Sequence, residues 1–280
     1  MWGFVTRNVA VEPPRLLVPF ATDEQEIYAW HAIVLGVMRA TERPTFESEA
    51  SKLIYEYVER HGTAKRNVLL DVAPVSSDEF RTELERLKSR GYLQEDGGTL
   101  QLALDVGAIE EHETDAGIVT IRPGRQRDFE GLVDAIRDVT SEETYVVAET
   151  IAEQLLYDEA VTRHNRVESR VFFVATIGEE VVGWTHLELP QVSRIRETAQ
   201  QTVGVKEDYR GLGIGSLLLR RGLDWAEANG FRKVYNSVPM TNDRALEFLG
   251  DHGWETEAIR RDHYTIGDEH VDEVMMAYQF

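Results

Sequence analysis

The stretch Val203-Gly-Val-Lys-Glu-Asp-Tyr-Arg-Gly-Leu-Gly-Ile-Gly-Ser-Leu-Leu218 decides the fold of the second half of this chain. Its start predicts a strand, its glycines at 211, 213 and 215 predict a tight loop, and its apolar end predicts the start of a helix. Such a loop brings backbone N–H groups close to an anion at the positive end of a helix. The spacing is neither the dinucleotide fingerprint nor a P-loop, so a glycine-rich turn without a ligand stays open at this point.

The segments around this loop predict alternating strands and helices, and therefore an α/β sheet. Upstream of the loop, we expect strands over 118–122, 171–177, 181–189 and 193–205, and helices over 125–139 and 148–164. Downstream, we expect helices over 214–229 and 242–252, and strands over 233–238, 254–266 and 271–280.

The segment Arg210-Gly-Leu-Gly-Ile-Gly215 resembles the acyl-CoA pyrophosphate loop of the GNAT N-acetyltransferases. Asn242-Asp-Arg-Ala245 and Gly253-Trp254 match two further features of that family at the expected places. The resemblance covers about residues 117 to 280. It implies a mixed, mostly antiparallel central sheet flanked by helices. It also implies acetyl-CoA, or another acyl-CoA, as co-substrate, and acyl transfer to a primary amine by direct attack.

The resemblance also assigns a co-substrate site. The amides of residues 211 to 216 would cradle the CoA pyrophosphate, a strand backbone would pair with the pantetheine, and an asparagine would bind the pantetheine arm. The residues expected there are Val203, Val205, Arg210, Gly211, Leu212, Gly213, Ile214, Gly215, Ser216 and Asn242. Plainer roles stay open for four positions, because Val203 and Val205 suit a core, Asn242 suits a helix N-cap and Arg210 suits an ion pair with Glu207.

The catalytic residues are less clearly marked. In the family a Glu often stands where this chain has Gln201, and a proton-donating Tyr where it has Leu249. Neither residue present can do that proton transfer. Substitutes on the predicted strands are Glu197, His186 or Glu188 as the base and Tyr264 as the acid. Each also has a structural alternative: a solvated carboxylate, a packed histidine or a half-buried tyrosine.

The first half predicts a separate, mainly helical domain over residues 1–112, followed by the acyltransferase domain over 113–280. We expect helices over 22–40, 46–60 and 64–70, and a further helix opened by Ser76 with Glu79 as its capping-box partner. A hairpin turning at Asp96-Gly97-Gly98 follows, and the acidic segment 105–117 is interpreted as a linker. Helix, short helix, helix and hairpin resemble a winged helix-turn-helix domain over about residues 44 to 104.

This winged-helix-like domain has two interpretations. Arg81, Arg86, Lys88 and Arg90 would face DNA if the helix over 77–90 were a recognition helix, but Glu83 and Glu85 interleave with them. We therefore favour a protein contact, such as a homodimer through this domain, over DNA. The rival functions are an acyl-CoA-sensing, DNA-binding regulator and a protein-assembly module.

The composition limits the remaining functions. The net charge is −20, both predicted domains are acidic, and 25 arginines accompany only 5 lysines. This pattern resembles proteins of salt-in halophiles, because molar salt screens carboxylate repulsion. The absence of cysteine excludes disulfides, thiolate nucleophiles and zinc–thiolate sites, and the histidine spacing predicts no metal site. No membrane span or signal peptide is expected, so a cytoplasmic location is the default.

Overall fold

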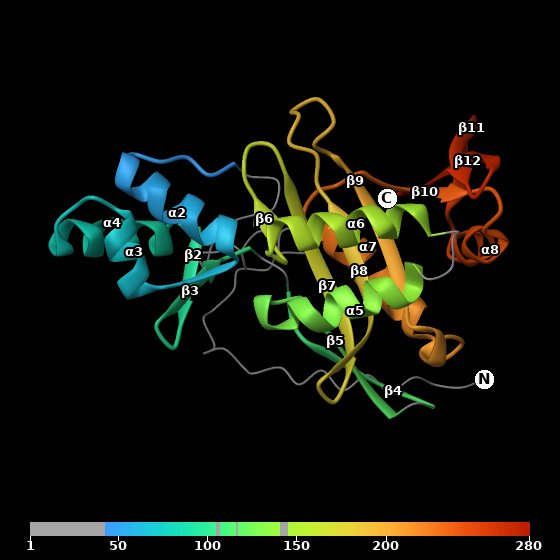
Figure 1. Cartoon of the computed structure of the whole chain (residues 1–280), viewed down its shortest axis with the longest axis horizontal. Helices are drawn as coiled ribbons and strands as arrows, with labels where there is room; N and C mark the ends of the chain where they lie inside the picture. The colour runs from blue at the N-terminus through green and yellow to red at the C-terminus, as the bar shows by residue number, and fades with distance from the viewer. Residues whose placement is uncertain (1–42, 105–106, 116, 141–144) are drawn as a thin grey trace, which may run out of the picture.

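The computed structural model describes residues 43–104, 107–115, 117–140 and 145–280, so the predicted helix over 22–40 lies outside the described residues. The first part of the described chain, which we call the N-terminal unit, packs three helices against a small sheet (Figure 1). The sheet is antiparallel, with strand order β1-β3-β2. The elements are α2 (Glu49–His61), β1 (Thr63–Lys65), α3 (Arg66–Val72), α4 (Ser77–Ser89), β2 (Leu93–Asp96) and β3 (Thr99–Leu102).

Local sequence signals explain these boundaries. The Ser48 side chain caps α2, and Gly62 ends that helix with a positive φ of 70°. Ser76 accepts the N–H of Glu79 at the start of α4, which is the N-cap half of the predicted capping box. Gly97 and Gly98 both have positive φ in the turn between β2 and β3, which is the conformation that a two-residue hairpin requires.

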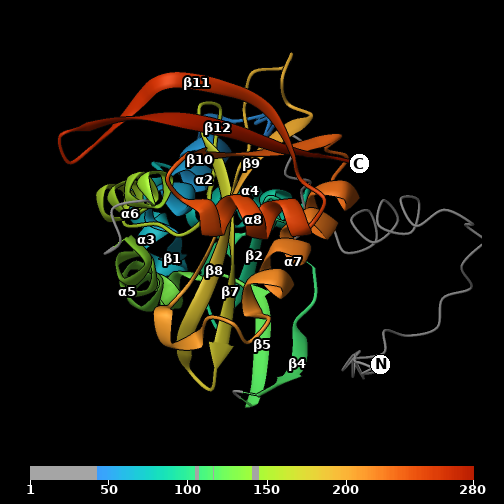
Figure 2. The same ribbon diagram turned by 90° about the vertical axis from the view of Figure 1, so that its right-hand side faces the viewer.

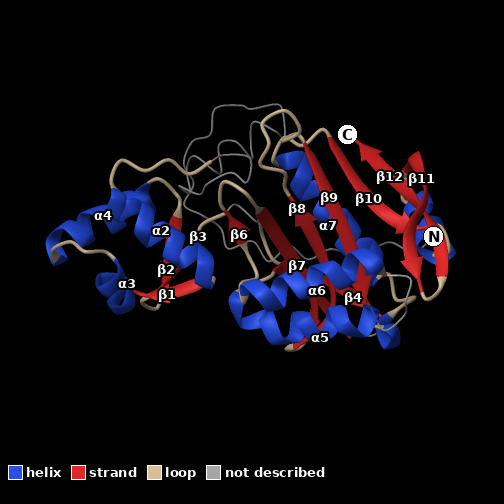
Figure 3. Ribbon diagram, turned by 45° about the horizontal axis from the view of Figure 1, so that its top comes forward, coloured by secondary structure: helices blue, strands red, loops and turns tan. Residues whose placement is uncertain are grey.

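The second part of the described chain, which we call the C-terminal unit, is one sheet of nine strands (Figure 3). The strand order is β11-β12-β10-β9-β8-β7-β5-β4, with β6 beside β7. The strands are β4 (Glu110–Thr114), β5 (Gly117–Pro123), β6 (Arg163–His164), β7 (Ser169–Ile177), β8 (Glu180–Glu188), β9 (Thr198–Val205), β10 (Lys233–Pro239), β11 (Glu255–Ile266) and β12 (Glu269–Gln279).

Helices cover both faces of this sheet (Figure 2). One face carries α5 (Phe129–Thr140), which follows the short η1 (Gln126–Asp128), and α6 (Val146–Asp158). The opposite face carries α7 (Ile214–Ala228), preceded by η2 (Glu207–Tyr209), and α8 (Asp243–Asp251). The predicted α/β fold with a mixed, mostly antiparallel sheet flanked by helices is therefore confirmed for this unit.

The sheet is interrupted between two neighbouring strands, β9 and β10. β9 and β10 run parallel and pair only over Thr198 to Gln200 and Lys233 to Tyr235 among the described residues. Beyond this short ladder both strands continue without pairing to each other. The two strands therefore diverge, and each leaves an unpaired edge facing the other.

Three predicted boundaries are wrong. Residues 110–114 are not linker but strand β4, which pairs with β5, so the predicted boundary at 112 lies inside a strand. Two side-chain bonds from Arg221 hold this edge, one to the Glu110 carboxylate (2.6 Å) and one to the carbonyl of Ala108 (2.9 Å). The helix predicted over 148–164 ends at Asp158, because Glu159 adopts a left-handed φ of 52°. The strand predicted over 193–205 begins only at residue 198.

Candidate active site

A cleft of about 470 Å³ fills the space where β9 and β10 diverge, and we call it the central cleft. Its walls are residues 202–205 of β9 and 236–239 of β10, with the glycine-rich loop at one end. Tyr145 and the start of α6 close one side, and Phe248 and Leu249 of α8 close another. The predicted loop and the predicted strand therefore meet in one cavity.

Backbone groups of β9 face this cleft. The N–H of Lys206 donates to the carbonyl of Val182 on β8 (3.0 Å). This bond identifies which residues of β9 are hydrogen-bonded to β8. Residues of an antiparallel ladder alternate between bonding the partner strand and pointing away from it. Thr202 and Gly204 therefore bond β8, and the N–H and C=O groups of Val203 and Val205 point toward the gap before β10. An extended ligand can bond to them as an added strand.

The glycine-rich loop presents open backbone to the same cleft. Gly211 and Gly213 have φ of 77° and 80°, and a Cβ atom at either position would have no neighbour within 4 Å. Gly213 is the N-cap of α7, so the first amides of this 15-residue helix have no helical partner and carry the positive end of its dipole. The arrangement suits a diphosphate. Leu212 and Ile214 pack into the core, so they contribute only their backbone.

Side chains at the cleft rim are held in place by local bonds. The Nε of Arg210 donates to the carbonyl of Val205 (2.9 Å), and its guanidinium lies 5.8 Å from the centre of the Tyr145 ring. Asn242 caps α8 by accepting the N–H of Ala245 (3.0 Å) and lines the cleft as well. Its two roles, N-cap and cleft wall, are compatible.

Ser216 reaches a histidine that the sequence did not single out. The Nδ1 of His252 lies 2.7 Å from the carbonyl of Phe248, which can only accept, so this nitrogen carries a proton. In the neutral ring Nε2 then accepts from the Ser216 hydroxyl, 2.8 Å away. Ser216 therefore offers an anion its backbone N–H rather than its side chain.

A second cavity of about 280 Å³ adjoins the central cleft, and we call it the side cavity. The two share the wall residues Val146, Val147, Thr202 and Ser237. The side cavity contains three of the predicted substitutes, on strands β8 and β11, and one acid that the sequence did not single out. These residues are His186, Glu188, Tyr264 and Glu273.

His186 lies in this cavity but is not suited to act as a base. It is buried, and burial together with the nearby Arg170 guanidinium lowers its pKa to about 3. Its ring packs against Phe172 with the ring centres 4.6 Å apart. Because an effective base has a pKa near the working pH, His186 is a neutral wall group.

Glu188 has the opposite character. Partial desolvation at the cavity wall and the carboxylate of Glu168 raise its pKa, although Arg170 opposes that shift. A carboxylate with a raised pKa is a better proton acceptor.

Tyr264 and Glu273 form a hydrogen-bonded pair on β11 and β12. The Tyr264 hydroxyl donates to Glu273 Oε1 (3.1 Å), and burial and the Glu273 carboxylate raise the pKa of Tyr264. Tyr264 therefore remains protonated. Glu273 is only 3% exposed, and its charge is balanced by Arg260 (Nη1 to Oε2, 2.9 Å).

The structure does not bring the remaining candidates to either cavity. Glu197 precedes β9, at the far end of that strand from the central cleft, and its exposed carboxylate lies 3.9 Å from Arg232. Gln201 lies on the face of the sheet that α7 covers, where its Nε2 donates to Thr185 Oγ1 (3.1 Å) and to the Leu219 carbonyl (3.0 Å). The residue of β9 that lines the side cavity is its neighbour Gln200. Leu249 is buried and forms part of the central cleft wall.

In the described part of the chain, histidines, aspartates and glutamates form no group of three with metal-binding geometry. The helices of that part include none that is both long and apolar enough to cross a bilayer.

Residues 133–254 match the model of the acetyltransferase (GNAT) family. An uncharacterized N-acetyltransferase of Methanocaldococcus jannaschii is 32% identical over 91 residues, which are 31% of this chain and 40% of that protein. An N-alpha-acetyltransferase of Sulfurisphaera tokodaii is 28% identical over 115 residues, 38% of this chain and 69% of that protein. The chain thus spans less than half of the first relative.

The fold also has a counterpart among solved structures. A protein from Streptococcus mutans has a crystal structure that matches with a TM-score of 0.50 and 22% identity. The match covers 57% of this chain and 98% of that one. At this identity the likeness concerns the fold alone.

Proposed function

We propose that this protein transfers an acetyl group from acetyl-CoA to a primary amine, because residues 133–254 match the model of the acetyltransferase (GNAT) family. One observation carries the proposal: the central cleft, which suits an extended thioester ligand, shares wall residues with a side cavity that holds a carboxylate able to accept a proton. A co-substrate in the first cavity and an amine in the second would meet at their shared wall.

The chemistry of the central cleft supports acetyl-CoA as the ligand. The amides of residues 211 to 216 suit its diphosphate, and the backbone of Val203 and Val205 suits the amide groups of its pantetheine arm. Arg210 adds a positive charge at the rim and Asn242 a polar wall. Most of these contacts come from the backbone.

The proposed reaction is one displacement. The amine nitrogen attacks the thioester carbonyl carbon, the C–N bond forms, the C–S bond breaks, and CoA leaves as the thiolate. The ammonium form of the amine must first lose a proton, and Glu188 is the group we assign to accept it, directly or through water. After the attack the nitrogen releases its second proton, and solvent carries a proton to the thiolate. The raised pKa of Tyr264 makes its hydroxyl too weak an acid for that step.

Acidic walls fit an amine that arrives as a cation. Glu188 and Glu273 both line the side cavity. Their charges attract an ammonium group but also stabilise it, so deprotonation becomes the demanding step. The rate should therefore rise with pH through the pKa of Glu188.

For the N-terminal unit we propose a winged-helix domain used for protein contact. The order of its helices and strands and its sheet order β1-β3-β2 support that assignment. The bases of α4 and its C-cap are balanced by carboxylates of the same unit. The pairs are Arg81–Asp78, Arg86–Glu83, Lys88–Glu85, Lys88–Glu95 and Arg90–Glu47. Phosphate binding would have to break these pairs, so DNA is the less favoured partner. We also propose that the protein is halophilic, because its net charge is −20, and that it is cytoplasmic.

The proposal is tested with purified full-length protein, acetyl-CoA and a panel of amines in molar KCl, by following CoA release. Glu188→Gln should lower kcat by roughly 10²-fold with unchanged acetyl-CoA affinity, because it removes only the proposed base. Glu197→Gln is the matched control, since it removes the same charge outside both cavities, and should retain full activity. Tight acetyl-CoA binding without turnover of any amine would instead favour a sensor.

A further inference from the structure

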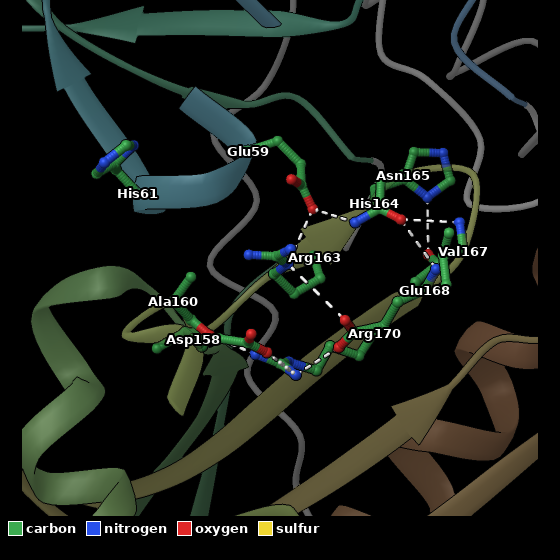
Figure 4. Close-up of polar contacts among 12 residues, drawn as sticks. Glu59, His61, Asp158, Ala160, Arg163, His164, Asn165, Val167, Glu168 and Arg170 are labelled. Carbon is green, nitrogen blue, oxygen red and sulfur yellow. Dashed lines mark hydrogen bonds and ion pairs between the residues drawn. The ribbon is translucent and has the colours of Figure 1, made fainter. Parts of the chain in front are cut away.

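A buried carboxylate of the N-terminal unit is held by the C-terminal unit (Figure 4). Glu59 of α2 is only 5% exposed, and its carboxylate contacts the hairpin formed by β6 and β7. Its Oε1 lies 2.9 Å from Arg163 Nε and accepts from Asn165 Nδ2 (2.8 Å), and the backbone N–H of His164 donates to the same carboxylate. Tyr55, one turn earlier on α2, donates to the His164 carbonyl (2.7 Å).

The charges continue from this contact along the edge of the sheet. Arg163 Nε also lies 4.0 Å from Glu168 Oε2, and Glu168 Oε1 lies 2.5 Å from Arg170 Nη1. Arg170 is 1% exposed, and it also binds Asp158 (2.8 Å) and the Ala160 carbonyl (2.8 Å) beyond the end of α6. Figure 4 shows these side chains as one alternating series of acids and bases.

The series ends at the proposed base. Arg170 on β7 is the direct cross-strand neighbour of Glu188 on β8, and its charge acts on both Glu188 and His186. Arg170 forms ion pairs with Glu168 and Asp158 and lies across the strand from Glu188, so the contacts of Glu168 influence how much of the Arg170 charge Glu188 feels. Other elements bring further groups to the surroundings of Glu188 or to the same cavity: Glu168, Tyr235, Arg260, Tyr264 and Glu273.

We propose that the N-terminal unit tunes the acceptor end of the active site through the chain Glu59–Arg163–Glu168–Arg170, in which Arg170 is a positioning residue for Glu188. The assignment of Glu188 as the base rests on the proposed function, whereas the coupling itself does not. A protein partner that displaces α2 from the hairpin would act on the amine site without touching it.

The series predicts shifts of opposite sign in the pKa of Glu188 when its first member, Glu59, or its second member, Arg163, is changed. Glu59→Gln leaves Arg163 to pair with Glu168 alone, which frees Arg170 for Glu188 and lowers the pKa of Glu188. Arg163→Gln leaves Glu168 to Arg170 alone, which withdraws Arg170 and raises that pKa. We expect the pKa of Glu188 to change by about half a unit in each variant, which is a fraction of the 1–3 units that a nearby opposite charge produces.

The test is a carbon-13 NMR titration of glutamate-labelled full-length protein, with the Glu188 signal assigned by its loss in Glu188→Gln. Glu56→Gln is the matched control, because Glu56 is on the same helix but exposed, and should leave the titration unchanged. The double variant E59Q/R163Q removes the ion pair without leaving a lone buried charge. The pKa of Glu188 in this variant should equal the wild-type value. The double variant also keeps the test possible if Arg163→Gln alone does not fold.

Equal Glu188 titrations in wild type and Glu59→Gln, or shifts of the same sign in Glu59→Gln and Arg163→Gln, would overturn the coupling. The pH profile of kcat/KM for the amine is the second readout. If the NMR titration moves and the profile does not, the coupling stands and the assignment of Glu188 as the base fails. If both move together, both stand.

Discussion

Replacing Gly213 tests the proposed diphosphate site most directly. Gly213 caps α7 with φ of 80°, and a side chain there would extend into open space in the central cleft. Gly213→Asp adds a carboxylate at that point, and Gly213→Asn adds the same shape without the charge. Asp and Asn tolerate the left-handed conformation better than most residues, so both variants should fold.

The expected difference between the two variants follows from Coulomb's law. At about 5 Å and an effective dielectric constant of about 20, one carboxylate repels each phosphate charge by roughly 3 kcal/mol. Solvent in an open cleft weakens this repulsion, and the positive end of α7 offsets part of it. We therefore expect the Asp variant to bind acetyl-CoA about 100-fold more weakly than the Asn variant.

Calorimetry at about 0.1 M and about 1 M KCl measures this difference, which should shrink at the higher concentration because the Debye length falls from about 10 Å to about 3 Å. Acetyl-pantetheine, which has no diphosphate, is the matched ligand and should bind both variants equally. Equal affinity of the Asp and Asn variants for acetyl-CoA would refute the placement of the diphosphate at this helix end.

Further predictions concern stability. Gly204→Ala would place a Cβ atom 2.7 Å from the Trp184 ring. It should cost about 1–3 kcal/mol in urea unfolding, whereas Gly250→Ala, in a helix with open space, should be neutral or stabilising. Burial raises the pKa of Asp128, but hydrogen bonds from Arg122 and a backbone N–H outweigh it, and the net pKa is lowered. Asp128→Asn should therefore destabilise the protein near pH 7, by a margin that shrinks as the pH falls below about 4. The melting temperature should rise between about 0.1 M and 2 M KCl, because salt screens the charge of −20. A melting temperature independent of KCl would remove the halophile interpretation.

Much of the fold was predictable because short sequence signals fix local structure. Ser76 with Glu79, Gly62 after α2 and Gly97-Gly98 between two strands each act within a few residues. The acidic strand β4 was not predictable in this way. Its side chains alternate only between partly and fully exposed, so it has no apolar period, and its pairing with β5 and the bonds from Arg221 hold it in the sheet.

The catalytic side was predictable only in part because it depends on which face of a strand a residue occupies. Aligning Gln201 with a family position identifies its place in the sequence, but side chains alternate between the two faces of a sheet. Gln201 shares a face with Val203 and lies under α7, whereas Gln200 lines the side cavity. Counting in steps of two from Val203 would have revealed this. Nothing local marks Glu273, which reaches the cavity through the pairing of β11 with β12.

The two cavities therefore differ in how strongly the sequence marks them. The central cleft is built from backbone groups, whose positions depend on glycines and on a helix start, so a short motif predicts it. The side cavity is built from side chains that five separate strands and α6 bring together, so changes there alter the chemistry without disturbing the motif. A missing acid or base at a family position then says little about activity. In this chain the group that accepts the proton is expected on β8. The same separation lets the N-terminal unit, through Arg170, act on the amine site while leaving the co-substrate site unchanged.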